Sequence, residues 1–135
     1  MYLLNTNVIS ELRKPKPHGA VLAWITPIED SQLFLSAVTL AEIQAGIEIT
    51  AEQNPQKANE LTAWLEAISK LYNVIPMGGP EFRCWARFMH RRSEQLYEDS
   101  MIAATAAVHN LTVVTRNTGD FAGFNVSLLN PFESK

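Results

Sequence analysis

The chain has 135 residues, of which 47% are hydrophobic and 19% charged. This composition is that of one ordinary globular domain over residues 1–135, and it excludes a disordered, collagen-like or coiled-coil chain. The single cysteine, Cys84, excludes an internal disulfide and a zinc site built on thiolates. With no targeting signal at the start, we expect a cytoplasmic protein. The formal net charge of −3 argues against general nucleic-acid binding, although four of the six arginines lie within residues 83–92.

Short apolar segments alternate with helical patterns along the whole chain. The run at 2–4 predicts a buried strand, after which Thr6 or Asn7 would cap a short helix ending near Leu12. In chain order, the spacing then predicts a helix over 20–25, a strand over 33–36, helices over 38–50 and 55–72, a strand over 73–76, helices over 82–89 and 100–109, and strands over 111–114 and 126–129. This alternation is typical of an α/β fold with a mainly parallel central sheet flanked by helices.

Polar residues lie where functional sites of such sheets are found. Asn5 follows the first expected strand and Asp120 follows the fourth, while Glu42 and Asp99 belong to helices. Open parallel sheets place their sites along the carboxyl edge, where loops and helix starts meet. Each residue also has an ordinary structural explanation: a helix-dipole partner for Asp99, a solvated face for Glu42 and a turn for Asp120.

Taken together, the acids indicate a metal site. Carboxylates that converge on one edge repel each other unless a cation lies among them. Oxygen ligands without histidine or cysteine suit Mg²⁺ or Mn²⁺, and such an ion lowers the pKa of a bound water and stabilises charge on a phosphate. Spacing alone does not establish that the acids converge.

Four segments in order along the chain carry a family resemblance. They are Leu3-Leu4-Asn5-Thr6-Asn7, Thr39-Leu40-Ala41-Glu42, Asp99-Ser100-Met101-Ile102-Ala103-Ala104, and Val114-Thr115-Arg116-Asn117-Thr118-Gly119-Asp120-Phe121. Together they resemble the motifs of PIN-domain ribonucleases of the VapC toxin type, over essentially the whole chain. Four motifs in register make this a specific match.

The resemblance implies a single PIN-like domain that is the toxin of a type II toxin–antitoxin system. Its implied activity is metal-dependent endoribonuclease cleavage of tRNA or rRNA, which inhibits translation and growth. Position 5, Glu42, Asp99 and Asp120 would be the catalytic residues and would hold Mg²⁺ or Mn²⁺. A VapB-type antitoxin, a homodimer and a larger toxin–antitoxin assembly are the implied partners, and no membrane is involved.

Three polar residues are candidates for positioning these ligands: Thr6, Thr115 and Asn117. Thr6 would serve equally well as a helix cap, and Asn117 as a turn residue.

Asn5 departs from the family, which has an aspartate there. Asparagine offers one neutral carbonyl oxygen and an NH₂ donor in place of a carboxylate. We therefore expect little or no nuclease activity from this chain, whether the substitution was introduced deliberately or arose naturally. One alternative is a non-catalytic RNA- or antitoxin-binding module. A nuclease acting on structured DNA is a weaker one, because such enzymes usually carry added domains.

Basic residues form two candidate RNA contacts. Arg83, Arg87 and Arg91 follow an i, i+4, i+8 spacing that would place them on one side of a helix, where they could contact phosphates. A solvated helix face balanced by neighbouring glutamates explains the same spacing. Arg13 and Lys14 lie just after the first motif and form the second group.

Overall fold

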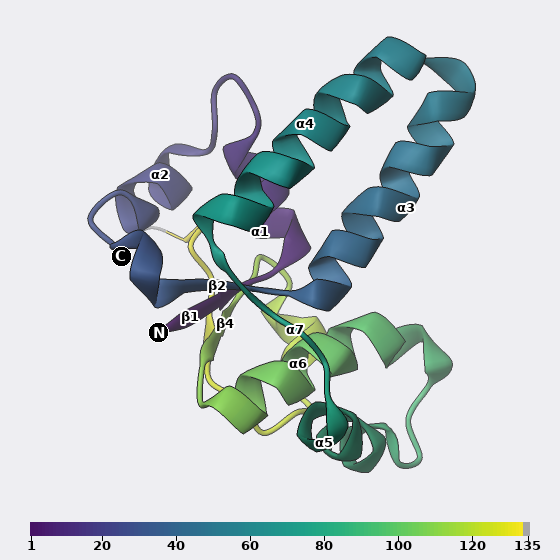
Figure 1. The fold of residues 1–135 in the computed structure, drawn as a ribbon. Coiled ribbons are helices and arrows are strands. Elements are labelled where there is room, and N and C mark those ends of the chain that lie inside the picture. Colours follow the sequence, from purple (N-terminus) through teal and green to yellow (C-terminus); the bar gives the residue numbers. More distant parts are fainter. Residues whose placement is uncertain (134–135) are drawn as a thin grey trace.

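The computed structural model describes residues 1–133 and contains a sheet in which all paired strands are parallel. Its strands are β1 (Tyr2–Leu4), β2 (Leu33–Ser36), β3 (Asn73–Ile75), β4 (Thr112–Val114) and β5 (Leu128–Leu129). They lie in the order β3-β2-β1-β4-β5. Helices lie on both sides of these strands (Figure 1). The predicted α/β class is confirmed, and the sheet is wholly parallel within the described residues. The expected domain ended at residue 135, so its last two positions lie outside them.

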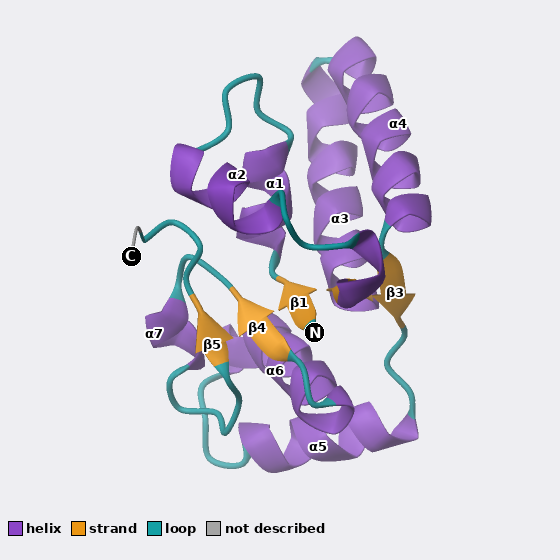
Figure 2. Cartoon of the chain, turned by 90° about the vertical axis from the view of Figure 1, so that its left-hand side faces the viewer, coloured by secondary structure: helices purple, strands orange, loops and turns teal. Residues whose placement is uncertain are grey.

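Both faces of the sheet are buried, because successive residues of a strand point to opposite sides. Leu4 and Val114 pack into the core beneath the helices within residues 6–71, whereas Leu3 and Val113 pack into a second core beneath the helices within residues 97–121. All four side chains are completely buried. The result is three layers, with the strands between two groups of helices (Figure 2).

The helices are α1 (Thr6–Leu12), α2 (Gly19–Ile25), α3 (Ala37–Gln53), α4 (Pro55–Leu71), α5 (Gly79–Met89), α6 (Tyr97–His109) and α7 (Thr118–Phe121). Two 3-10 turns cover Asp30–Gln32 and Glu94–Leu96. Two differences from the predicted boundaries affect the site. The α6 helix begins at Tyr97 rather than Ser100, and Asp120 lies in the unpredicted helix α7 rather than in a turn.

The α6 helix lies close to the sheet because its inner side is made of small residues. Ala103, Ala104 and Ala106 are completely buried, and small side chains allow a helix to approach its neighbours closely. A helix that connects parallel strands runs back across the sheet, so it starts at the carboxyl edge. This direction brings the first turn of α6 to the edge where β1 and β4 end. None of the helices in the described part of the chain is long and apolar enough to cross a membrane.

Candidate functional site

Asn5 anchors the site at the carboxyl end of β1. Its backbone N–H donates to the carbonyl oxygen of Val114 (2.9 Å), which joins the ends of β1 and β4. Its side-chain oxygen accepts from the backbone N–H of Thr6 (2.8 Å), so Asn5 caps α1. The sequence had predicted Thr6 or Asn7 as the cap. Asparagine is a favoured capping residue because its carbonyl satisfies a free N–H of the first turn.

The other end of the Asn5 amide is held by Thr115, which follows β4. Asn5 Nδ2 donates to Thr115 Oγ1 over 3.0 Å, and Asn7 Nδ2 donates to the same oxygen over 3.2 Å. The backbone N–H of Asn117 is a third donor, at 3.1 Å. Thr115 is completely buried. One hydroxyl oxygen therefore receives three donors, although it has two acceptor lone pairs.

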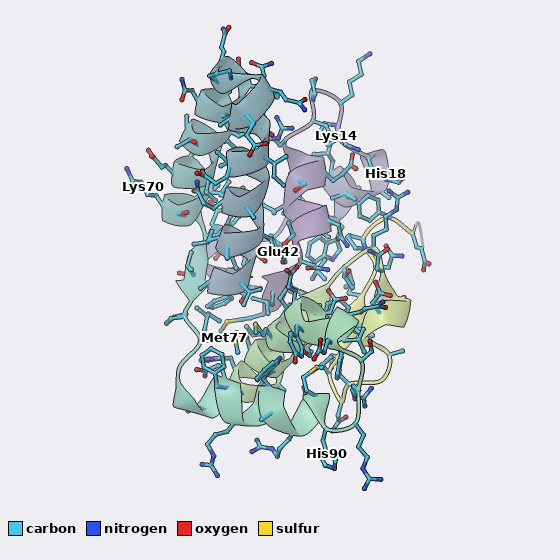
Figure 3. All side chains as sticks on the ribbon, turned by 90° about the vertical axis from the view of Figure 1, so that its right-hand side faces the viewer. Lys14, His18, Glu42, Lys70, Met77 and His90 are labelled. Atoms are coloured by element: carbon cyan, nitrogen blue, oxygen red, sulfur yellow. The ribbon has the colours of Figure 1, made fainter. Side chains whose placement is uncertain are left out.

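Glu42 reaches the same edge from the second turn of α3 and lies where α1, α3 and α6 meet (Figure 3). Thr6 Oγ1 lies 3.0 Å from Glu42 Oε1 and 3.1 Å from the hydroxyl of the buried Thr39. Burial raises the pKa of Glu42 to about 7, together with a hydrogen bond to Glu98 and the charges of Glu98 and Asp99. The hydrogen bond from Thr6 opposes this shift.

Asp99 lies in the first turn of α6, next to Glu98. Burial raises the pKa of Asp99, and the charges of Asp120 and Glu98 raise it further. The acids of α3, α6 and α7 are therefore close enough to influence one another's charge. The start of α6 also favours negative side chains, because its free N–H groups carry partial positive charge.

The acidic cluster consists of Glu42, Glu98, Asp99 and Asp120, and the chemistry of its side chains decides whether it suits a metal ion. Its donors are oxygens only, which are the ligands that Mg²⁺ and Mn²⁺ prefer. The mutual repulsion that raises these pKa values is also what a cation would relieve. Within residues 1–133, however, no three side chains of His, Cys, Asp or Glu stand close enough to hold one ion. A carboxyl group of Glu42 that is hydrogen-bonded to Glu98 must reorient before it can act as a ligand.

Of the three positioning candidates, Thr6 contacts Glu42 and Thr115 holds the amide of Asn5. Asn117 contributes its backbone N–H to Thr115. Sequence reasoning missed Glu98. Its signal was its place beside Asp99, but the helix was predicted to begin at Ser100, which left Glu98 outside the first turn. Once the helix starts at Tyr97, both acids belong to that turn.

The basic candidates are dispersed. The α5 helix ends at Met89 and Arg91 has a left-handed backbone (φ 62°), so the prediction of one helical stripe through Arg83, Arg87 and Arg91 is wrong. Lys14 pairs with Glu11 (2.9 Å), and Arg13 lies over the ring of Trp64 at 5.7 Å. Both members of the second group are therefore engaged in contacts within the protein.

A parallel sheet between two helical layers, with acids gathered at its carboxyl edge, defines the class of α/β proteins that carry their functional site at that edge. A family model described as PIN domain matches residues 2–124, so the chain belongs to the PIN-domain family. The resemblance to VapC-type toxins found in the sequence is confirmed by the relatives.

Toxin FitB of Neisseria gonorrhoeae is 37% identical to the chain, with 98% of this chain and 99% of FitB covered. VapC ribonuclease Y4jK of Sinorhizobium fredii is 35% identical, with 98% and 99% covered. The solved structure described as FitAB bound to an IR36 DNA fragment superposes with a TM-score of 0.86 at 34% identity, covering 100% of this chain and 98% of that one.

Proposed function

We propose that the chain is the toxin of a type II toxin–antitoxin system, built for metal-dependent endoribonuclease cleavage and impaired by Asn5. The observation that carries this proposal is that Asn5 follows β1 at the edge where Thr6 contacts Glu42 and where the acids of α3, α6 and α7 influence one another's charge. The naming of relatives as toxins and ribonucleases supports it.

In this proposal, Glu42, Asp99 and Asp120 would hold Mg²⁺ or Mn²⁺ together with position 5, and Glu98 would add negative charge beside them. When bound, the cation would supply an activated water and neutralise charge on the scissile phosphate. Thr6 orients the carboxylate of Glu42 through its 3.0 Å contact. Thr115 holds the side chain at position 5, so its role is positioning.

The substrate is RNA, with tRNA and rRNA as the candidate classes, and the chain acts in the cytoplasm. The partners are a VapB-type antitoxin and a second copy of the toxin, within a larger toxin–antitoxin assembly. A solved complex of FitAB with DNA supports an antitoxin partner.

Asn5 also favours a second candidate, a module that binds RNA or antitoxin without cleavage. A neutral amide removes one unit of negative charge from the cluster, and its nitrogen cannot bind a cation.

A cleavage assay tests both candidates. Purified chain, the Asn5→Asp variant and the Asn5→Asp/Asp99→Asn double variant are incubated with tRNA and rRNA in Mg²⁺ or in EDTA. We expect Asn5→Asp to cleave about 100-fold faster than the Asn5 chain, since even groups that support a metal ligand contribute about 10–100-fold. The double variant and the EDTA samples should be inactive.

Glu48→Gln is the matched control, because Glu48 is an exposed glutamate of the same helix as Glu42. It should leave cleavage by the Asn5→Asp variant unchanged. Equal cleavage rates for the Asn5 chain and Asn5→Asp would contradict the proposal that Asn5 impairs cleavage. No cleavage by either, with RNA or antitoxin still bound, would favour the non-catalytic module.

A further inference from the structure

A hollow lies at the opposite edge of the sheet from the acidic cluster. Its volume is about 560 Å³, and it is lined by the end of α6, by α5 and by the residues that precede β4 and β5. Its lining combines the apolar side chains of Phe88 and Leu111 with polar ones. The polar side chains are Arg87, Asn110, Asn125 and Ser127.

Arg87 also lines two neighbouring hollows on α5. One, of about 550 Å³, includes Arg83 and the first residues of the helix, and the other, of about 450 Å³, includes His90. No aspartate or glutamate lines any of the three hollows. Within residues 1–133, the ion pairs involve neither arginine. Both guanidinium groups are therefore exposed cations that the protein leaves without an acidic partner.

We propose that this hollow binds a nucleoside phosphate. The guanidinium group of Arg87 presents planar donors that match phosphate oxygens, and Arg83 offers a second such group in the neighbouring hollow that Arg87 also lines. The side-chain amides of Asn110 and Asn125 each offer both a donor and an acceptor, which is what the edge of a base requires. The apolar part of the lining accepts the face of the base.

The location keeps a bound anion apart from the acidic cluster. The acids begin at Asp99 in the first turn of α6, whereas the hollow lies at the end of that helix beside Val108. At 1.5 Å per residue, about 14 Å of helix separates the two. A phosphate in the hollow is therefore beyond the Debye length of the acidic cluster at physiological ionic strength, which is about 8 Å.

The nucleoside phosphate is either part of an RNA strand or a free nucleotide. As part of RNA, it would be a contact away from the cleavage site, and only this source rests on the proposed ribonuclease function. The chemistry of recognition is the same for both sources.

The test measures binding of each probe to the full isotope-labelled chain in EDTA. Binding is monitored through the amide NMR signals of Asn110, Asn125 and Ser127. The probes are AMP and a ten-nucleotide RNA of mixed sequence. We expect these three signals to shift, and Arg87→Ala to weaken binding about tenfold or more, since a hydrogen bond to a charged group contributes about that factor. Lys70→Ala removes a cation from the distant helix α4 (Figure 3) and should leave binding unchanged.

Asn125→Asp is a second variant, which places a negative charge at an exposed position of the same hollow and should also weaken binding. Saturation by AMP assigns the site to free nucleotides, and saturation by RNA alone assigns it to the RNA strand. The proposal is overturned if neither probe shifts the three signals, or if Arg87→Ala binds the probes as tightly as the unsubstituted chain. Because EDTA prevents cleavage, failure of the ribonuclease proposal leaves this result readable.

Discussion

The side-chain nitrogen of Asn5 donates to the hydroxyl oxygen of Thr115 over 3.0 Å, across 110 positions of the sequence. The same oxygen accepts from Asn7 and from the backbone of Asn117. An aspartate at position 5 would instead accept a hydrogen bond from the hydroxyl of Thr115. The two lone pairs of the Thr115 oxygen would then accept from Asn7 and from the backbone of Asn117. The surroundings of position 5 therefore suit a carboxylate better than the amide that is present.

Removing the Thr115 hydroxyl should destabilise the fold. Thr115→Val leaves the buried amide of Asn5 and two part-buried donors without their acceptor, and we expect a loss of about 2–3 kcal/mol in the free energy of unfolding. Urea denaturation monitored by circular dichroism measures it. Thr105→Val is the control, because that buried hydroxyl donates only to the carbonyl oxygen of Met101 in its own helix. A loss no larger than that of the control would contradict the network described for Thr115.

Restoring the carboxylate should create a cation dependence of stability. With Asn5→Asp, Mg²⁺ or Mn²⁺ binds the folded chain more tightly, and a concentration 100 times the Kd stabilises it by about 2.7 kcal/mol. We expect the melting temperature of Asn5→Asp to rise with the cation and to fall again with EDTA. The melting temperature of the Asn5 chain should change much less. An equal response of both chains would mean that position 5 is not a ligand.

Stability should fall as the pH rises from 4.5 to about 7. The pKa of Glu42 is raised from its ordinary 4.5 to about 7, so within this window the folded chain keeps a proton that the unfolded chain has released. The raised pKa of Asp99 acts in the same direction. Glu42→Gln should therefore stabilise the chain at pH 8 and change it little at pH 5, as measured by urea denaturation in EDTA.

Glu52→Gln controls for the loss of one negative charge, because Glu52 is exposed near the far end of α3. The pH dependence assigned to Glu42 is refuted if the two variants have the same profile of stability against pH.

Growth inhibition should follow the same residues as cleavage. Asn5→Asp, expressed without an antitoxin, should arrest growth of a susceptible bacterial host, and adding Asp99→Ala should abolish the arrest. Expression of the Asn5 chain should permit growth. Colony counts after induction measure the effect, with immunoblots to establish equal expression. Normal growth with Asn5→Asp at full expression would count against the toxin proposal.

The amino-acid sequence by itself determined the order of the strands and of the helices other than α7, because buried parallel strands require short apolar runs and their crossover helices require apolar spacing. It also carried the family resemblance, since the motifs around Glu42, Asp99 and Asp120 keep their order along the chain. The departure at Asn5 was equally visible, because it is a property of one position.

Only the tertiary structure decided which side chains meet. Glu98 joins Glu42 because α6 begins at Tyr97, a boundary set by the preceding 3-10 turn and by packing on the sheet. The three donors that converge on Thr115 come from the residue after β1, from α1 and from the residues after β4. No local pattern encodes a contact across more than 100 positions. Arg91 departs from the side of α5 that carries Arg83 and Arg87 because the helix ends at Met89. Local spacing predicts faces of helices, whereas the ends of helices and the contacts between distant segments depend on how the whole chain packs.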